Sequence, residues 1–482
     1  MSTIRALVGG PSNWVVERLR GLGEWFSDWS LRYMPDPYVI AILLTFTTFG
    51  AALVTGTAPK GAFDAWYDGV WTLLPFMATL SVMLMAGDAI AKSPSVTRVL
   101  ERIAALPNSR FTAVWFTSFV AMSTALISWA IGLIVGAIMA KRVAFEMREK
   151  GIEVHYPLLA AAGYTSLMIF HSGLTASAAL LMADASLIPA TFPEQFRVVI
   201  PISETVGSPV NILTAGLELA IIPVVMAAMH PKTDIHELPR DMRSEIATIV
   251  ESEPDTTPQP EEAAYQDPEL TVADKLNNSW MLGLLIAIFP IYYVVNTWFL
   301  RAGGLSNLTL NSINALFLFG AIVLWRTPIR IVNQMKDSVS NISGIIFLFP
   351  FYAGIAGLLT NTGLASMLTR FFAQQATPAT WPLIGITISA VVNVFIPSGG
   401  GQWVAQGPIL METTQQFGMP LSTAVLLEML GDSLTNMIQP FWAIPLLAIA
   451  NLRARDIIGY TAVAMVVGFV IVGTTVTVFL GM

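Results

Sequence analysis

Nine apolar windows, each long enough to cross the hydrocarbon core of a bilayer, dominate this chain of 482 residues. Inside such a core every backbone N–H and C=O needs a partner, so we expect these windows to form helices. Only 12% of the residues are charged, whereas a soluble protein carries about 25%. The chain is therefore predicted to be an all-α polytopic membrane protein. The windows are 37–55, 71–91, 157–187, 202–229, 280–300, 309–326, 338–360, 421–450 and 457–481.

Two further apolar stretches, 111–140 and 384–412, are interrupted by polar and helix-breaking residues. The second contains the run Asn393-Val-Phe-Ile-Pro-Ser-Gly-Gly-Gly-Gln-Trp403, in which the proline removes a donor and the glycines disfavour a helix. The first contains Ser128-Trp-Ala-Ile-Gly132. Broken, polar backbone at membrane depth is typical of a transporter's substrate site, and the alternative is a surface loop between two spans.

Lysine and arginine assign the sides of the membrane, because cytoplasmic loops carry an excess of them. Basic residues flank 111–140 at both ends, so we interpret this stretch as a re-entrant hairpin that enters and leaves on the cytoplasmic side. Loops near 56–70, 188–200, 301–308 and 361–383 are poor in basic residues and are predicted to lie outside. The result is about nine transmembrane helices, two re-entrant hairpins and a cytoplasmic N-terminus. The flanking residues are Lys92, Arg98, Arg102 and Arg110 before the stretch, and Lys141, Arg142, Arg148 and Lys150 after it.

Four regions follow from this topology. Residues 1–36 form a cytoplasmic amphipathic segment, and 37–230 form the first transmembrane repeat. Residues 231–278 form an acidic, proline-containing cytoplasmic linker, read as solvated chain and not as a binding site. Residues 279–482 contain a linking helix and the second repeat. In the N-terminal segment four aromatic residues are predicted to face lipid: Trp14, Trp25, Phe26 and Trp29.

The two repeats are related by weak matches at one offset of about 268 residues. With one extra span between them, 280–300, the halves are predicted to point in opposite directions, and two broken helices, near 163–181 and 431–450, follow the hairpins. Inverted repeats whose broken elements meet at the midplane are typical of secondary transporters, although chance similarity among apolar helices is the alternative. The matches pair Leu100-Glu-Arg102 with Leu368-Thr-Arg370, Gly132 with Gly400, Gly163 with Gly431, and His171 with Gln439.

Four motifs, spread through the second half, resemble the short-chain fatty acid transporter family of the ion transporter superfamily. They are Phe349-Pro-Phe-Tyr-Ala-Gly-Ile355, Pro397-Ser-Gly-Gly-Gly-Gln-Trp403, Gln439-Pro-Phe-Trp-Ala443 and Arg455-Asp-Ile-Ile-Gly-Tyr460. The resemblance implies uptake of acetoacetate, butyrate and similar acids by a homodimer. It also implies a multi-pass protein in the lipid bilayer of the cytoplasmic (inner) membrane. The first hairpin departs from the family, since Ser128 stands where Asn is expected before Trp129.

A carrier of small monocarboxylates needs hydrogen-bond donors without a large fixed charge, so that the anion can also leave. Helix N-termini that begin after the hairpin tips supply such donors, and glycines there let the backbone approach a carboxylate. His171 is interpreted as a substrate ligand or proton carrier, with a packing role as the alternative. The predicted substrate-binding residues are Ser128, Trp129, Gly132, His171, Ser172, Thr175, Asn393, Ser398, Gly399, Gly400, Gly401, Gln402, Trp403 and Gln439.

Carboxylates inside the spans are candidates for coupling the acid to H⁺ or Na⁺. Asp432 is the best placed, because it shares a helical face with Asn436 just before the Gln439-Pro440 break. A purely structural Asp432, held by neighbouring polar groups, is the alternative. Glu218 and Glu428 are further intramembrane acids, whereas three near span ends are expected to cap helices or face water: Asp88, Glu204 and Glu412.

Several functions are disfavoured by what the sequence lacks. There is no cysteine, which excludes disulfides and thiolate metal sites. The triple glycine is not followed by Gly-Lys-Ser/Thr, so a phosphate-binding loop and a primary pump are not indicated. We expect no enzyme activity, cofactor, metal or nucleic-acid partner. The alternatives are a dicarboxylate or other organic-anion carrier of the same superfamily, a channel, and, more distantly, a membrane-embedded enzyme acting on lipid acyl chains.

Overall fold

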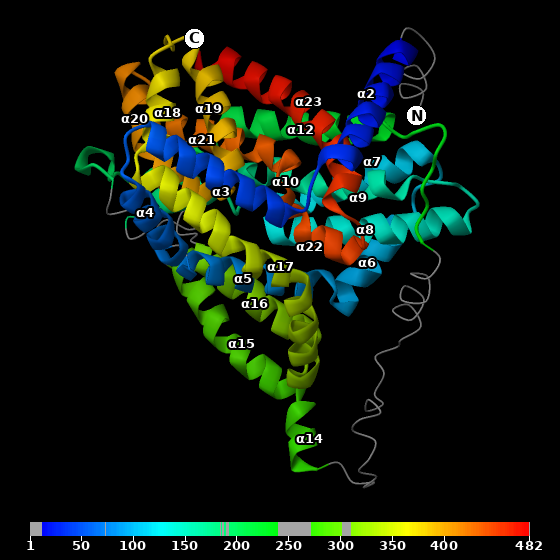
Figure 1. The fold of residues 1–482 in the computed structure, drawn as a ribbon. Coiled ribbons are helices and arrows are strands. Elements are labelled where there is room, and N and C mark those ends of the chain that lie inside the picture. Colours follow the sequence, from blue (N-terminus) through cyan, green and yellow to red (C-terminus); the bar gives the residue numbers. More distant parts are fainter. Residues whose placement is uncertain are drawn as a thin grey trace.

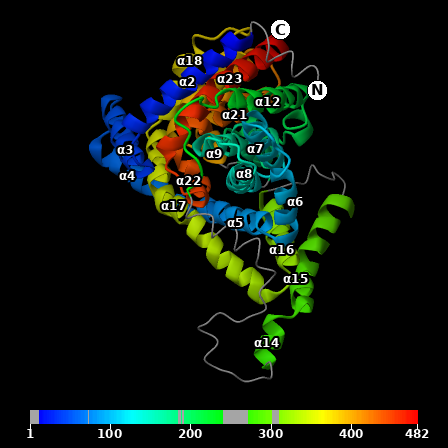
Figure 2. The same ribbon diagram turned by 90° about the vertical axis from the view of Figure 1, so that its right-hand side faces the viewer.

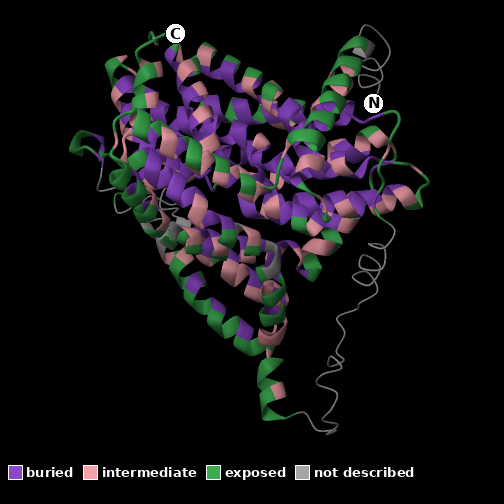
Figure 3. Ribbon diagram, in the orientation of Figure 1, coloured by how far each residue is buried: buried purple, intermediate pink, exposed green. Residues whose placement is uncertain are grey.

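In the computed structural model, residues 12–72, 74–183, 185, 188, 192–239, 271–300 and 310–481 are described. Helices make up about four-fifths of this part, and no strand occurs within it, so the predicted all-α class is confirmed (Figure 1). Most helices pack into one body, while α14 and α15 project from one end in both views (Figures 1 and 2). Buried residues are concentrated in the body, and α14 and α15 are largely exposed (Figure 3).

The first half of the chain contains the helices from α2 to α12, of which α2 comes first and is the longest. The region predicted as an external loop near 56–70 is instead α4, an aromatic-rich helix packed on α17 through the close contact of Gly69 with Gly357. The elements are α2 (Ser12–Tyr33), α3 (Pro37–Val54), α4 (Pro59–Thr72), α5 (Leu74–Ala91), α6 (Pro94–Ala104), α7 (Arg110–Ala125), α8 (Trp129–Glu149), α9 (Tyr156–Tyr164), α10 (Ser166–Ile169), η1 (Phe170–Ser172), α11 (Ser177–Ala183), η2 (Glu194–Phe196), η3 (Ile202–Glu204) and α12 (Pro209–Ala228).

Residues 240–270, which make up most of the predicted linker, lie outside the described residues. The second half begins after them. Helix α17 is longer than the span expected at 338–360, because it continues into the basic segment that precedes that span. The elements are α14 (Val272–Asn277), α15 (Trp280–Val294), η4 (Val295–Leu300), α16 (Leu310–Trp325), α17 (Pro328–Asn361), α18 (Leu364–Ala373), α19 (Trp381–Phe395), α20 (Gly399–Gln416), α21 (Leu421–Thr435), η6 (Asn436–Ile438), α22 (Pro440–Ala450) and α23 (Ala454–Leu480).

The N-terminal helix α2 is amphipathic, and three of its four predicted lipid-facing aromatic residues are well exposed, namely Trp14, Trp25 and Trp29. Phe26 differs from the prediction, since it is half-buried and packs against the core. The reason is that α2 lies on α23, with which Gly23 and Ser27 are in close contact.

Secondary structure recurs in the same order in the two halves. The succession α6, α7, α8, α9 with α10, η1 and α11 corresponds to α18, α19, α20, α21, η6 and α22, so that the two short helices α9 and α10 stand where the second half has the single helix α21. In each half a short amphipathic helix precedes two helices joined by a three-residue break, at 126–128 and 396–398. The opposite orientation of the halves and the re-entrant path of the hairpins stay predictions.

Both predicted helix breaks occur. Helix α21 with η6 meets α22 at a bend of 51° at Gln439. The Tyr164 hydroxyl lies between the carbonyl groups at the break, 2.8 Å from the backbone oxygen of Asn436 and 2.7 Å from that of Gln439, and its one hydrogen is shared between them. By length and hydropathy, five helices among the described residues can cross a membrane, or six if the bent pair counts as one span. The predicted count of about nine stays a prediction.

The start of the predicted linker is held by histidines against the body. The ring nitrogen Nδ1 of His155 accepts from the backbone N–H of His236 (3.1 Å). The backbone N–H of His155 donates to Nε2 of His230 (3.0 Å). Burial lowers the pKa of His155 to about 3 and that of His230 to about 4, so both rings are neutral near pH 7. The first residues of this segment are therefore ordered chain.

Candidate functional site

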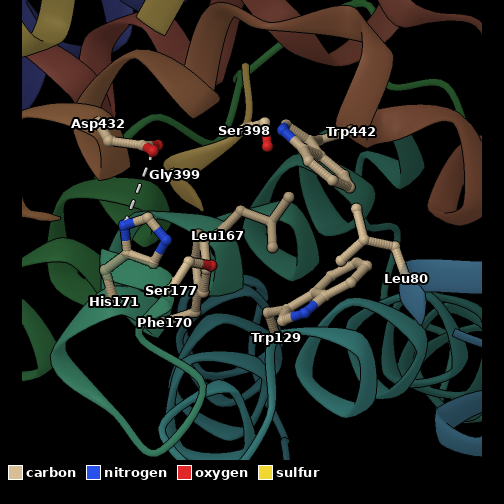
Figure 4. Close-up of a pocket in the computed structure, with 10 residues that line it drawn as sticks. All are labelled: Leu80, Trp129, Leu167, Phe170, His171, Ser177, Ser398, Gly399, Asp432 and Trp442. Carbon is tan, nitrogen blue, oxygen red and sulfur yellow. Dashed lines mark ion pairs between the residues drawn. The ribbon is translucent and has the colours of Figure 1, made fainter. Parts of the chain in front are cut away.

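A small cavity lies where the two hairpin tips and the two broken helices meet (Figure 4). Its volume of about 20 Å³ is room for a single water molecule. In the close-up His171 and Asp432 lie on one side, and Trp129, Trp442 and Leu80 lie on the other. Both repeats contribute to its lining, which consists of Leu80, Trp129, Leu167, Phe170, His171, Ser177, Ser398, Gly399, Asp432 and Trp442.

The second hairpin tip ends in a helix N-terminus at this cavity. Helix α20 begins at Gly399 after an extended Ser398, whose hydroxyl accepts from the Gly401 N–H (3.3 Å). The carbonyl of Pro397 accepts from the Trp442 indole (2.8 Å), which fixes the tip to α22. The first-turn N–H groups of a helix have no carbonyl partner within it and carry a partial positive charge. This end of α20 is therefore suited to an anion.

Gly399 is in contact with both ionisable residues of the cavity. A Cβ at this position would lie 2.8 Å from His171 Nε2 and 2.9 Å from Asp432 Oδ2, which is closer than a side chain tolerates. Glycine is therefore required for the tip to approach the other two residues so closely. The approach brings α20, η1 and α21 together at one point.

His171 and Asp432 face one another across the cavity (Figure 4). His171 Nδ1 lies 3.8 Å from Asp432 Oδ2 and 3.2 Å from the carbonyl of Met429. The other carboxylate oxygen of Asp432 accepts from the Asn436 amide (3.1 Å). Among the described residues, His171 Nε2 and Asp432 Oδ2 have no hydrogen-bond partner, although both are buried. These two atoms can bind a ligand, a proton or a cation.

Asn393 orients this cluster without lining the cavity. Its amide lies 2.9 Å from the Asp432 carbonyl and 3.1 Å from Asn436 Oδ1. The amide of Asn436 in turn donates to the Asp432 carboxylate, so α19 and α21 are joined through a short chain of amides. Asn393 and Asn436 therefore contact Asp432 and not the cavity itself.

The first hairpin contributes an apolar wall. Helix α8 begins at Trp129, whose backbone N–H donates to the Thr175 hydroxyl (3.1 Å). The Trp129 ring packs edge-on against Trp442, with ring centroids 5.2 Å apart. Ser128 precedes α8 and makes no side-chain bond to its first turn. Thr175, and not Ser128, therefore caps this helix.

Three predicted substrate ligands lie in the packing of the hairpins and not at the cavity. Gly132 faces α7, where an added Cβ would be 2.5 Å from that of Ala125. The Gln402 amide donates to the carbonyl of Ser389 (2.9 Å). Trp403 is fully buried, with its ring 6.1 Å from that of Phe192. Gly400 and Gly401 belong to the first turn of α20 but do not line the cavity.

Two further predicted ligands support the breaks instead. The Gln439 amide donates to the carbonyl of Val394 (3.1 Å), and its side-chain oxygen accepts from Tyr352 (3.3 Å). The carbonyl of Ser172 accepts from Asn211 (3.1 Å). These bonds satisfy backbone groups that helix breaks leave open.

Several lining residues were not among the predicted site residues. Leu80 and Leu167 sit in apolar helices and carry no sequence signal that separates them from core leucines. Ser177 begins α11 just after the break at His171, and a search for polar residues beside breaks would have found it. Trp442 belongs to the Gln439-Pro-Phe-Trp-Ala443 motif that carries the family resemblance.

The three acids expected near span ends lie outside the lining of the cavity. Asp88, which was expected to cap a helix or face water near a span end, is fully buried, where it accepts from Ser338 (2.7 Å) and pairs with Lys92 (3.0 Å). Glu412 pairs with Arg370 (3.1 Å) near the surface. Glu204 is exposed, as expected.

Comparison with known proteins covers nearly the whole chain. A family model described as short chain fatty acid transporter matches residues 18–480. A candidate short-chain fatty acid transporter of Escherichia coli (strain K12) is 33% identical over 450 residues, which are 93% of this chain and 97% of that protein. One of Haemophilus influenzae is 32% identical over 441 residues, or 90% and 94% of the two chains.

Among solved structures, the YdaH transporter of Alcanivorax borkumensis covers 93% of this chain and 98% of its own. It is 15% identical, with a TM-score of 0.48, a likeness too weak to place any site residue. The two relatives are much stronger matches, since their identity of 32–33% extends over at least 90% of the chain, and the family model matches residues 18–480. This chain belongs to the short-chain fatty acid transporter family.

Proposed function

We propose that this protein is a secondary active transporter that couples the uptake of short-chain fatty acids, acetoacetate and butyrate among them, to H⁺ or Na⁺. The observation that supports the proposal is the composition of the cavity. One end presents the N-terminus of α20 with His171 and Asp432, and the other presents Trp129, Trp442 and Leu80. A small carboxylate with an apolar tail matches both ends.

The polar end explains why the anion would travel with a positive charge. The substrate carboxylate accepts from the first turn of α20, where the helix dipole favours it. Asp432 lies at the same place and repels an anion as long as it is ionised. A proton or cation at Asp432, or a proton on His171, removes that repulsion. Binding of the acid and of the coupling ion is then mutually dependent.

The apolar end sets the length of the acid. Leucine and tryptophan side chains fill the space beyond the polar groups, and the cavity is smaller than a four-carbon acid. The walls must separate to admit substrate. The first hairpin can move as a unit because α7 and α8 pack closely on one another, whereas α19 and α20 pack mainly on α21 and would move with it. A second carboxylate would meet indole and leucine side chains, so a dicarboxylate carrier is the weaker alternative.

Exchange in proteoliposomes tests the substrate class. We expect purified protein to exchange labelled butyrate with unlabelled butyrate and acetoacetate, with weaker exchange for succinate and for long-chain acids. An inward H⁺ or Na⁺ gradient should drive accumulation. Succinate exchanged faster than every monocarboxylate would favour the dicarboxylate alternative, and failure to exchange any acid would remove the proposal.

We also propose that the protein functions as a homodimer in the cytoplasmic (inner) membrane, with its N-terminus inside. The absence of native cysteine makes the topology testable by labelling. Lys150→Cys should react only from the cytoplasmic side, and Gln375→Cys only from outside, since both positions are exposed in the structure. Labelling of both from one side contradicts the inverted arrangement. Crosslinking in membranes tests the dimer.

A further inference from the structure

Glu428 is a buried acid that the cavity does not use. It lies in α21, one turn before Asp432, and its side chain is fully buried. Neither of its carboxyl oxygens has a hydrogen-bond partner among the described residues. Glu428 does not line the cavity, and the acid of α21 that does is Asp432. A buried polar group of this kind calls for a physical explanation.

The elements packed against α21 bring little charge to Glu428. Helices α10, α11 and α19 and the turn η6 contain no titratable residue. Helix α20 contains Glu412, which pairs with Arg370 near the surface. The turn η1 contains His171, whose Nδ1 is directed at Met429 and Asp432.

Helix α23 is the remaining neighbour of α21, and its titratable residues lie in its first two turns. Arg455, Asp456 and Tyr460 precede Thr461, whose hydroxyl donates to the carbonyl of Met437. Met437 lies beyond Asp432 at the break, on the side away from Glu428 along the chain. These groups are therefore displaced along the helix axis from Glu428.

An ionised carboxylate in this setting would be strongly unfavourable. A buried charge without a cation or hydrogen-bond donors costs several kcal/mol, and the group takes up a proton instead. Residues four apart on a helix have Cβ atoms about 5–6 Å from each other, so Glu428 and Asp432 also repel one another when both are ionised. The two acids together hold at least one proton in this conformation.

We propose that Glu428 is the proton-carrying acid of this transporter, a role that rests on the proposed function. The proton reaches the cavity with the substrate anion and passes by way of Asp432 to Glu428, which becomes the neutral acid. The pair already shares one proton before loading, so Asp432 and Glu428 are both neutral while the anion is bound, and Asp432, the acid in contact with the binding centre, does not repel it. On the opposite side the anion leaves, Glu428 gives its proton back through Asp432, and one proton and one anion have crossed together.

The test compares Glu428→Gln with Glu218→Gln in proteoliposomes. Glu218, in α12, is equally buried and lies outside the cavity, so it is a matched control. With the outside acidified, we expect wild type and Glu218→Gln to accumulate butyrate and Glu428→Gln to lose accumulation. Exchange of labelled for unlabelled butyrate moves no net proton and should persist in Glu428→Gln. Glu428→Asp, which keeps an acid, should restore accumulation.

The outcomes separate the two proposals. Wild type that exchanges no acid contradicts the proposed function itself. Wild type driven by the pH gradient, together with Glu428→Gln that accumulates equally well, overturns the role of Glu428 alone. Accumulation driven only by a sodium gradient also overturns it and leaves the carrier function in place.

A spectroscopic measurement in detergent covers the case in which Glu428→Gln does not transport at all. At neutral pH we expect the infrared carbonyl band of protonated carboxylic acids to be weaker in Glu428→Gln than in wild type. An unchanged band shows that Glu428 is ionised and contradicts the proposal. This readout needs folded protein but no transport activity.

Discussion

The two hairpin tips have the same plan and different chemistry. Each is a three-residue break followed by a helix that starts at the cavity. At the first tip the carbonyl of Leu126 accepts from the Leu174 N–H (2.8 Å), and Thr175 caps Trp129. At the second tip Gly399 approaches His171 and Asp432, which retain unbonded ring and carboxylate atoms.

This difference indicates a division of labour between the repeats. The first tip is closed by backbone bonds and presents an indole, so it forms a wall. The second presents a helix N-terminus beside ionisable groups, so it forms the polar end. His171 is an exception, because it comes from the first repeat but lies against the second tip. Sequence symmetry between the halves thus does not imply equal roles in the site.

The largest effect is expected at Gly399. Gly399→Ala places a methyl group against His171 Nε2 and Asp432 Oδ2 and should abolish transport. Gly401→Ala is the matched control, because the nearest contact of its methyl group is the Ser398 hydroxyl at 3.2 Å. Initial rates of butyrate uptake, normalised to folded protein, measure both. Transport by Gly399→Ala at the level of Gly401→Ala would show that the second tip does not need this close approach.

The sequence predicted the positions of both tips and of the Gln439-Pro440 break, because proline and glycine at membrane depth have few structural solutions. It also singled out His171 and Asp432, which the structure brings together across more than half of the chain. The directions of Gln402 and Trp403 were not predictable. Rotation of α20 about its axis is set by tertiary packing after a non-helical tip, and sequence spacing alone does not fix it.

A second class of omission concerns apolar residues. Leu80 and Leu167 line the cavity, yet each looks like any other leucine of an apolar helix. Glycine is ambiguous in another way, because the sequence singles it out near a tip but does not show what it is used for. Gly132 lies at the end of the first turn of α8 and Gly399 is the first residue of α20; the former allows helix packing and the latter allows approach to ionisable groups. Only the neighbours in space distinguish these two uses of glycine.

Gly132→Ala sharpens that distinction and should have a smaller, structural effect. The new methyl group would meet Ala125 at 2.5 Å and push α7 and α8 apart. Overpacking of this kind costs about 1–3 kcal/mol of stability. We expect a lower melting temperature in detergent with an unchanged KM for butyrate in the protein that remains folded. A higher KM at unchanged melting temperature would instead place Gly132 in the substrate site.

The smallest effects are expected for the two residues that cap the helices after the tips, Thr175 and Ser398. Thr175→Val removes the acceptor of the Trp129 N–H, and Ser398→Ala removes the acceptor of the Gly401 N–H. Each lost cap costs about 1 kcal/mol. At the first tip this cost should appear only as reduced stability, because α8 supplies a wall. At the second tip the loss disturbs the turn that binds the carboxylate, and apparent affinity for butyrate should fall about fivefold. Equal changes in KM for the two variants would mean that both helix N-termini bind the anion, and the division between wall and polar end would have to be abandoned.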